Sequence, residues 1–159
     1  MTIEAKALNE VPRDPGLYAM YGGLPEGWVA YVGQAGNLAR RLAQHLERRD
    51  SSVTTGTSAV GLHVDYITRA VWWVHSDFSN KYRRLAAELI AFDIFNPALR
   101  SRGGISQEAR DLLEEPRFVT EMKKLLREEP AGEYRPPSLP NLADRLANIE
   151  ARLTRLEGS

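Results

Sequence analysis

The chain of 159 residues contains no cysteine, carries no net charge and has no long apolar run. The absence of cysteine excludes disulfides and thiolate metal sites, and it leaves the redox compartment open. Zero net charge means that any attraction to nucleic acid must be local. No apolar stretch approaches the ~20 residues that cross a bilayer, and the first residues lack the apolar core of a signal peptide. We therefore expect a cytoplasmic protein with no membrane partner.

The signatures of several common enzyme classes are also missing. The sequence has no Gly-x-Ser-x-Gly elbow, Walker loop or dinucleotide fingerprint. No cluster of histidine and carboxylates appears at short spacing, so neither a zinc site nor a two-metal site is supported. With 43% apolar and 26% charged residues, the composition is typical of an ordinary globular protein, and the length suits one domain with an appendage.

Two short runs rich in aromatic and apolar residues predict a β-hairpin. Residues 16–21 and 28–33 read as its strands, and the Gly- and Pro-containing run 22–27 reads as the connection. Side chains alternate along a strand, so Tyr31 is expected on the same side as Val29. Further strands are expected at residues 64–67 and 71–75.

Two helices are predicted next. Asn37 is a good N-cap, and a core stripe follows it at i, i+4 and i+8, formed by Leu38, Leu42 and Leu46. A neighbouring stripe at i, i+4 and i+7 is formed by Arg41, His45 and Arg48. The second helix covers residues 80–95 and is ended by Pro97. Gly103-Gly104 then marks the expected limit of a first domain, residues 1–104.

The remainder of the chain is predicted to be an extension. Residues 105–128 read as two short helices, and residues 129–138 read as an extended linker. Residues 139–157 have apolar side chains at the spacing of a coiled-coil seam, namely Leu139, Leu142, Leu146, Ile149, Leu153 and Leu156. So narrow a seam needs a partner, most simply its own copy, and we expect a homo-oligomer. The alternative is a helix folded back onto the domain.

Tyr18, Tyr31, Arg41 and His45 form the first candidate catalytic set. Hydrolysis of a phosphodiester needs a base for water, positive charge for the transition state, and usually a divalent cation. A tyrosine is a poor base unless nearby cations lower its pKa, as Arg41, His45 and a metal are suited to do. Each residue alone has a structural explanation, because hairpin tyrosines pack across strands and Arg41 and His45 suit a solvated helix face. The ordered combination is what favours a site.

Glu88 is the second candidate, at the edge of the apolar face of the second helix. A carboxylate in that place needs a partner. One alternative is an ion pair with Arg84, one turn earlier. The other is a hard divalent cation such as Mg²⁺, which takes one or two protein carboxylates and otherwise keeps water and phosphate oxygens. The spacing alone does not decide between them.

Arginines gather on or beside these two helices. If the helices line one face, their guanidinium groups supply phosphate contacts that position a duplex without reading its sequence. The alternative is scattered solubilising charge. The candidate nucleic-acid-binding residues are Arg40, Arg48, Arg49, Arg84, Arg100 and Arg102.

The order of these elements resembles the GIY-YIG endonuclease family. The resemblance rests on Gly16-Leu17-Tyr18, on Tyr31-Val32-Gly33, on Arg41 and His45, and on Glu88 in a downstream helix followed by Asn96-Pro97. It covers roughly residues 14–102. The family implies a small α/β domain with a three-stranded antiparallel sheet flanked by helices, and single-metal hydrolysis of DNA with Mg²⁺ or Mn²⁺.

The resemblance also implies roles for the matched residues. Tyr18 or Tyr31 would act as, or hold, the general base, and His45 would assist it. Arg41 would stabilise the transition state, and Glu88 would bind the metal. The family commonly has an asparagine about a dozen residues after the glutamate, and here that position is Arg100.

The sequence therefore predicts a metal-dependent DNA endonuclease with an oligomerising C-terminal coiled coil. A second hypothesis is a catalytically weak or inactive nucleic-acid-binding module that keeps the fold. A third, an interaction protein assembled by its heptads, explains residues 139–157 but not the order of tyrosine, arginine and histidine.

Overall fold

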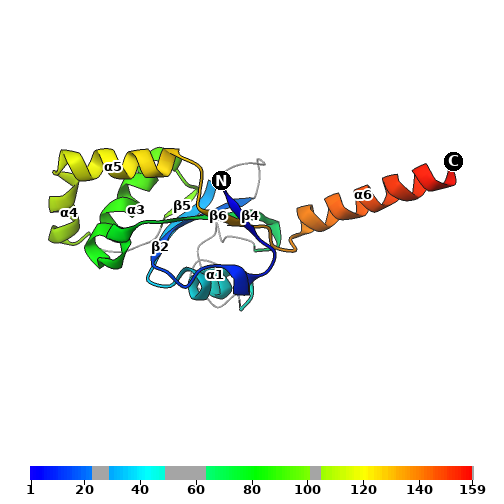
Figure 1. Cartoon of the computed structure of the whole chain (residues 1–159), viewed down its shortest axis with the longest axis horizontal. Coiled ribbons are helices and arrows are strands. Elements are labelled where there is room, and N and C mark those ends of the chain that lie inside the picture. Colours follow the sequence, from blue (N-terminus) through cyan, green and yellow to red (C-terminus); the bar gives the residue numbers. More distant parts are fainter. Residues whose placement is uncertain (23–28, 49–63, 101–104, 159) are drawn as a thin grey trace.

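A computed structural model of the chain describes residues 1–22, 29–48, 64–100 and 105–158 (Figure 1). Within these residues, six strands form one mixed sheet in the order β1-β6-β4-β2-β3-β5, so the predicted mixture of helices and strands is confirmed. The strands are β1 Ile3–Ala5, β2 Gly16–Gly22, β3 Val29–Ala35, β4 Ile67–Val74, β5 Leu99–Arg100 and β6 Gly132–Tyr134.

The centre of the sheet contains the three predicted antiparallel strands. β2 pairs antiparallel with β3 on one side and with β4 on the other. The prediction that the sheet has only three strands is wrong, because β6 joins β4 antiparallel, β1 joins β6 parallel and β5 joins β3 parallel. These extra strands are two or three residues long and pair across long separations, as Ile3 does with Gly132. Such short strands leave no alternating pattern in the sequence.

Helices cover both faces of the sheet (Figure 1). α1 lies against one face, and α3, α4 and α5 gather against the other. The α-helices of the described residues are α1 Leu38–Leu46, α3 Lys81–Phe95, α4 Gln107–Leu113, α5 Pro116–Arg127 and α6 Leu139–Glu157. Short 3-10 helices are η1 Leu8–Glu10, η2 Val64–Tyr66 and η3 Ser76–Ser79. The segment 64–67, predicted as a strand, is therefore mostly a 3-10 turn that leads into β4.

The two faces of the sheet bury separate apolar clusters. The cluster under α1 contains the predicted stripe of Leu38, Leu42 and Leu46. The cluster on the other face joins α3 to α5 through Phe118 and Met122, both buried. The predicted domain limit at residue 104 is wrong for this reason, because α4 and α5 complete the core of the same domain. Gly103-Gly104 predicts a domain limit in the sequence, but a pair of glycines does not require a break between cores.

The segment 129–138, predicted as a linker, belongs to the sheet. The backbone N–H of Ala131 donates to the carbonyl of Trp72 at 2.9 Å, and Gly132 pairs with Trp72 in the register of β4 and β6. Gly132 leaves room for the Trp72 indole, which occupies the space that a side chain would fill. Tyr134 is buried at the end of β6. Part of this proline-rich segment is therefore a short paired strand.

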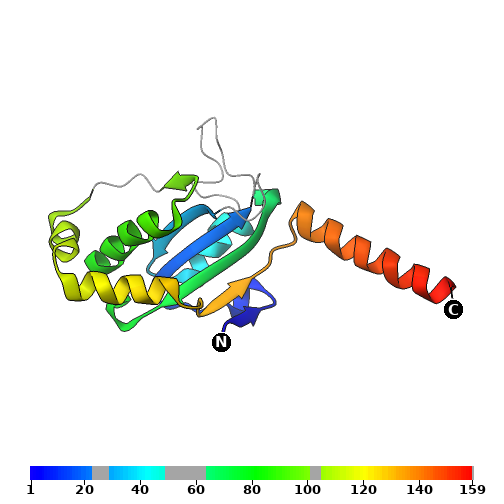
Figure 2. The same ribbon diagram turned by 90° about the horizontal axis from the view of Figure 1, so that it is seen from above.

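α6 projects away from the rest of the chain in both views (Figure 2). Its start is fixed by the side-chain amide of Asn141, which donates to the carbonyls of Thr68 at 2.9 Å and Pro136 at 2.7 Å. From Leu142 to Gly158 every residue is exposed. The alternative in which this helix folds back onto the domain is therefore not what the structure shows. A search of the described helices for one long and apolar enough to cross a membrane found none.

Candidate active site

Tyr18 and His45 form a hydrogen-bonded pair between the sheet and α1. Tyr18 lies in the middle of β2, and His45 lies in the last turn of α1. The Tyr18 hydroxyl is 2.7 Å from His45 Nε2, and both side chains are completely buried. The alternative of a solvated face is thus wrong for His45, which belongs to the buried side of α1 together with Leu38 and Leu42.

Tyr31 completes a cluster of three rings. Its ring centroid is 6.0 Å from that of Tyr18 and 5.6 Å from that of His45. Tyr31 faces the α1 side of the sheet, whereas Val29 packs on the other side. The expectation that the two share a face is wrong because the register shifts there, with Met20 opposite Tyr31 and Tyr21 opposite Val29. The bulge holds one extra residue in β3 and reverses the alternation.

Close packing explains the glycines of the two motifs Gly16-Leu17-Tyr18 and Tyr31-Val32-Gly33. Gly33 stands opposite Tyr18, and a Cβ there would lie 2.5 Å from the Tyr18 hydroxyl and 2.9 Å from Tyr31 Cε1. At Gly16 a Cβ would lie 2.5 Å from the carbonyl oxygen of Trp73 and 2.7 Å from Leu38 Cδ1. Both glycines therefore permit the approach that brings the tyrosines and α1 together.

Arg41 lies on α1 one turn before His45 and is half-buried. Its Nη1 donates to Gln44 Oε1 at 3.1 Å. Burial lowers the pKa of Arg41, but the neighbouring Tyr18 and Tyr31 outweigh this and raise it. The guanidinium is therefore a fixed positive charge beside both tyrosine hydroxyls.

The protonation states of the three rings follow from burial. Burial raises the pKa of Tyr18 well above its ordinary value, and Tyr31 adds to this while Arg41 opposes it. Burial also raises the pKa of Tyr31, as does the charge of Glu88, against the effect of Arg41. Burial, together with Arg41, lowers the pKa of His45 from 6.5 to about 3. At neutral pH both tyrosines are protonated and His45 is neutral.

This electrostatic result corrects one expectation. Arg41 and His45 were expected to lower the pKa of a catalytic tyrosine. Arg41 does act in that direction, but the loss of hydration around Tyr18 and Tyr31 is the larger effect. His45 contributes no positive charge, because its own burial keeps it neutral. In the protein without substrate or metal, neither tyrosine is prepared to act as a base.

Glu88 acts electrostatically on this cluster from α3, in the opposite helix layer. It lies at the middle of α3, is 7% exposed, and its charge raises the pKa of Tyr31. The candidate ligand is one buried carboxylate, which offers hard oxygen donors. Mg²⁺ and Mn²⁺ favour such ligands, and Mg²⁺ usually takes only one or two protein carboxylates. The residues present therefore fit a single hard divalent cation at Glu88.

An arginine-lined pocket adjoins the cluster. Its volume is about 500 Å³, and three guanidinium groups line it, from Arg40, Arg41 and Arg84. The other lining residues are Gln34, Ala35, Gly36, Asn37 and Gln44, none of which is acidic. An open pocket with three positive charges and neutral amides suits a phosphate group. Arg41 lines the pocket and also interacts with both tyrosines, so the pocket lies next to the tyrosine cluster.

Arg84 has a structural task as well. Its Nε donates to Gln34 Oε1 at 3.0 Å and its Nη1 to the carbonyl of Phe78 at 2.7 Å. These bonds join α3 to β3 and to η3, and burial lowers the pKa of Arg84. The side chain is therefore held in place before any ligand binds.

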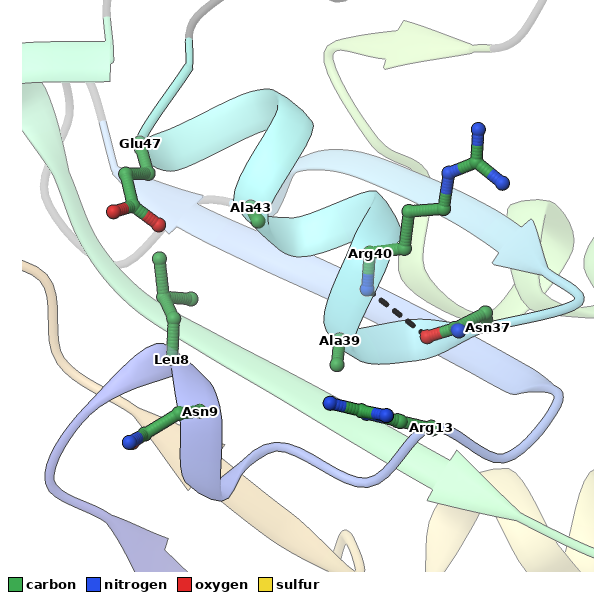
Figure 3. A pocket seen from close by; sticks show the side chains of 8 residues that line it. All are labelled: Leu8, Asn9, Arg13, Asn37, Ala39, Arg40, Ala43 and Glu47. Atoms are coloured by element: carbon green, nitrogen blue, oxygen red, sulfur yellow. Dashed lines mark hydrogen bonds between the residues drawn. The ribbon is translucent and has the colours of Figure 1, made fainter.

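A second pocket, of about 360 Å³, lies on the other side of the start of α1 (Figure 3). It is lined by Leu8, Asn9, Arg13, Asn37, Ala39, Arg40, Ala43 and Glu47. The Asn37 side chain accepts from the backbone N–H of Arg40 at 3.0 Å, as its predicted role of N-cap requires. Figure 3 shows the Arg40 guanidinium directed away from Glu47. With a carboxylate in its lining, this pocket suits phosphate less well.

Within the described residues, none of the other predicted arginines lies at the site. Arg48 is exposed just beyond the end of α1. Arg49, Arg102 and the side chain of Arg100 lie outside the described residues. The backbone of Arg100, in β5, pairs with Val32 of β3, the strand that also carries Tyr31.

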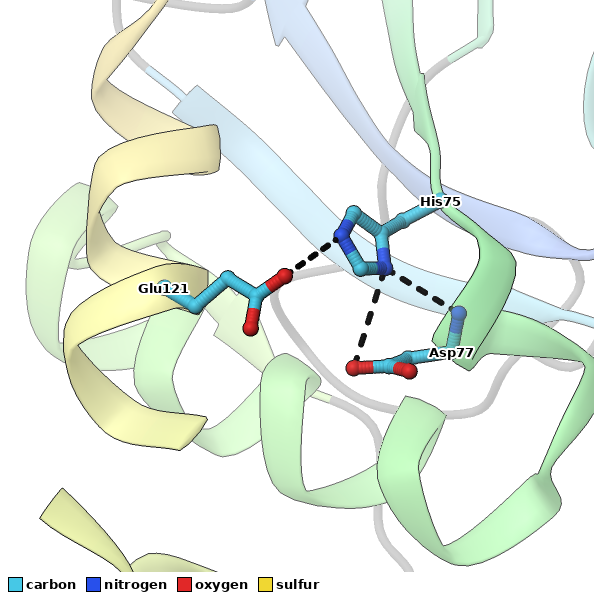
Figure 4. Close-up of side chains that lie close together, drawn as sticks. All are labelled: His75, Asp77 and Glu121. Atoms are coloured by element: carbon cyan, nitrogen blue, oxygen red, sulfur yellow. Dashed lines mark hydrogen bonds and ion pairs between the residues drawn. The ribbon is translucent and has the colours of Figure 1, made fainter. Parts of the chain in front are cut away.

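His75, Asp77 and Glu121 form a group that sequence reasoning did not assemble (Figure 4). His75 Nδ1 accepts from the backbone N–H of Asp77 at 3.0 Å, so Nε2 carries the proton and donates to Glu121 Oε1 at 3.0 Å. Asp77 also pairs with Arg83 at 2.9 Å. The two ring nitrogens thus cap η3 and tie the end of β4 to α5, which is a structural role for His75. The separation of 46 positions between His75 and Glu121 hid the contact in the sequence.

Comparison of the chain with protein-family models found no match, and comparison with curated proteins found none either.

Proposed function

We propose that the protein is a divalent-metal-dependent endonuclease that hydrolyses DNA phosphodiester bonds. The observation that carries this proposal is the grouping of Tyr18, Tyr31, His45 and Arg41 next to an arginine-lined pocket, with the charge of the buried Glu88 acting on Tyr31. These residues come from β2, β3, α1 and α3. An ordinary packing cluster has no need of a buried carboxylate and a guanidinium whose charges both act on the same phenol.

Arg41 is suited to the phosphate that reacts. It keeps its charge at any physiological pH and lies beside the two tyrosine hydroxyls. Negative charge grows on the phosphate oxygens in the transition state, and a guanidinium fixed in advance stabilises that charge without reorganisation. Arg40 and Arg84 at the same pocket hold the neighbouring phosphates of the strand.

The Tyr18–His45 pair supplies a route for the proton of the attacking water. Water gives its proton to the Tyr18 oxygen while the Tyr18 hydroxyl proton passes to His45 Nε2, so the phenol is neutral before and after. In the free protein the pKa of His45, about 3, opposes this step. A phosphodiester bound at Arg41 adds negative charge beside the imidazole, which raises that pKa toward its usual range.

Glu88 is the residue that would hold Mg²⁺ or Mn²⁺. The cation supplies Lewis acidity to a phosphate oxygen when it is bound. Glu88 contributes a single negative charge at the cluster, and its buried position limits competing solvent. Tyr31, whose pKa it raises, stays protonated and can donate a hydrogen bond to a phosphate oxygen.

Nicking of supercoiled plasmid in Mg²⁺ or Mn²⁺ tests the proposal. Glu88→Gln keeps the shape of the side chain and removes its charge, and we expect a loss of about a hundredfold or more in the nicking rate. Glu121→Gln is the matched control, because Glu121 belongs to the His75 group. The control should cut like the wild type. Undiminished cutting by Glu88→Gln would contradict the proposed metal role, and selective loss in Glu121→Gln would move it to the His75 group.

The second hypothesis, a binding module that does not cut, is favoured by one observation. Tyr18 is completely buried, and burial keeps both tyrosines protonated and His45 neutral. A module of this kind would bind DNA through the arginine pocket and show no nicking with any divalent cation. Tyr31→Phe separates the two hypotheses further, because it should slow cutting by an enzyme and leave the affinity of a module unchanged.

A further inference from the structure

α6 carries two kinds of pattern along its exposed surface. Its apolar side chains repeat at intervals of three and four residues, and their exposed fractions run from 39% for Leu142 to 72% for Leu156. In heptad terms, Leu139, Leu146 and Leu153 occupy the a positions, and Leu142, Ile149 and Leu156 occupy the d positions. Six large apolar side chains on one stripe of a projecting helix are costly to leave in water.

The positions that flank this seam are charged in a regular way. The g positions are Arg145 and Arg152, and the e positions in the second and third heptads are Glu150 and Glu157. One flank is therefore positive and the other negative. In the part of the chain that the structure describes, none of these four side chains forms an ion pair.

These charges distinguish the two ways in which copies of α6 can pair. In a parallel pair, each g residue faces the e residue five positions later on the partner helix. Arg145 then meets Glu150, Arg152 meets Glu157, and the symmetry of the pair repeats both contacts. In an antiparallel pair, g faces g and e faces e, so arginine meets arginine and glutamate meets glutamate. The charge pattern favours the parallel arrangement and opposes the antiparallel one.

We propose that α6 assembles the protein through parallel pairing with α6 of further copies of the same chain. The seam of the six apolar residues forms the interface, and the Arg–Glu contacts set the orientation. A different protein as the occupant would not need α6 to be complementary to itself. Leu at the a positions with Ile149 at a d position shifts the preference from two strands toward three or four.

Parallel pairing has a consequence for the domains. Each α6 is anchored at its start to the carbonyls of Thr68 and Pro136, close to the sheet. In a parallel assembly the domains therefore gather at the same end. Their arginine pockets are then held at a high effective concentration near one another. The self-association does not depend on whether the domain cuts DNA.

Charge reversal in the full-length chain tests the proposal. Light scattering over a series of protein concentrations should give the wild type a mass that is a multiple of 17.9 kDa. Arg145→Glu with Arg152→Glu places glutamate opposite glutamate and should raise the dissociation constant at least about tenfold. Adding Glu150→Arg and Glu157→Arg restores opposite charges in the parallel pair, and the fourfold variant should regain the wild-type mass.

Two controls complete the test. Arg155→Glu changes charge at a position away from the seam and should leave the mass unchanged. Leu146→Glu with Leu153→Glu interrupts the seam and should give monomers, while circular dichroism shows that the domain remains folded. A wild type that is monomeric at every concentration would overturn the proposal. Failure of the fourfold variant to recover would overturn it as well.

The orientation is measured directly with a spin label. The chain has no cysteine, so Thr154→Cys provides a single attachment point. In a parallel assembly the labels near the ends of the helices lie together, whereas in an antiparallel pair they are separated by most of the helix length, about 1.5 Å per residue. A short distance by pulsed electron paramagnetic resonance supports the proposal, and a long one contradicts it.

Discussion

At the scale of single residues, Gly33 shows how close packing shapes the candidate site. The Tyr18 hydroxyl occupies the space that a side chain at position 33 would fill, and from there it reaches His45 Nε2. Tyr18 is completely buried and cannot turn aside at low cost. The glycine is therefore part of the site, although it carries no chemistry of its own.

Gly33→Ala should destabilise the protein by about 1–3 kcal/mol, because the new methyl group overpacks the contact with Tyr18. Unfolding in urea measures the change. Gly36→Ala is the matched control, since a Cβ at Gly36 would meet its nearest neighbour, Arg84, at 3.7 Å. The control should stay within about 0.5 kcal/mol of the wild type. Equal effects of the two substitutions would contradict the packing argument.

His45 makes the stability of the protein depend on pH in a predictable direction. Its pKa falls from 6.5 to about 3 in the folded protein, so the unfolded chain binds the proton first as the pH drops. The corresponding stability is fully present above pH 6.5 and is lost between pH 6.5 and pH 3. Between about pH 7 and about pH 5 the wild type should lose roughly 2 kcal/mol from this group.

His45→Gln isolates that contribution, because glutamine has no proton to gain while other acidic groups titrate in both proteins. The free energy of unfolding, measured in urea at each pH, should fall less steeply for the variant by about 2 kcal/mol over the same interval. Parallel pH profiles for the two proteins would show that His45 is not held neutral in the folded state.

At the scale of elements, β6 determines where the folded domain ends and the projecting helix α6 begins. Its pairing with β4 and β1, and the burial of Tyr134, make residues 132–134 part of the sheet. A chain that ends after residue 130 therefore loses two neighbouring strand pairings as well as α6. Reduced association of such a chain would not identify α6 as the cause.

Truncation after residue 138 separates the two effects. We expect this chain to unfold cooperatively at a temperature within a few degrees of the full-length protein, because α6 is exposed from Leu142 onward. The chain that ends after residue 130 should melt far lower or without cooperativity, since β6 is missing. Thermal unfolding followed by circular dichroism compares them. Similar melting of both truncated chains would mean that β6 contributes little.

The elements differed in how readily the sequence revealed them. The core strands and the helices α1 and α3 follow from local signals, such as the Asn37 cap and the leucine stripe that begins at Leu38, and the structure has both helices where they are expected. β1, β5 and β6 could not be predicted, since two or three residues with distant partners carry no periodicity. The bulge beside Tyr31 was hidden for a related reason, because only the pairing with β2 shows which strand holds the extra residue.

The candidate site was partly visible in the sequence. The order of tyrosine, arginine and histidine identified residues that the fold does bring together. The protonation states were not predictable, because they depend on how completely Tyr18 and His45 are buried. The arginine pocket also required the fold, since Arg84 comes to it from α3 through its bond to Gln34 on β3.

At the scale of the whole molecule, charge is concentrated locally in a protein that is neutral overall. Three arginines share one pocket without an acidic residue, whereas the pocket on the other side of α1 includes Glu47. A neutral molecule exerts little long-range attraction on DNA, so binding should depend on the few phosphates that this pocket contacts. Affinity should then fall with salt along a shallow slope.

Arg40→Ala tests whether the pocket is that contact. Arg40 lines the pocket, and the hydrogen bonds of Arg84 make the latter less suitable for substitution. Removing one phosphate contact should weaken binding to DNA of any sequence and reduce the slope of log affinity against log salt by about one. Arg117→Ala, at an exposed position of α5 on the opposite helix layer, is the matched control and should leave the slope unchanged. Fluorescence anisotropy at several salt concentrations gives both slopes. Each protein–phosphate ion pair releases counterions, so the loss of one pair must lower the slope. Equal slopes for Arg40→Ala and the wild type would therefore mean that phosphate binds elsewhere.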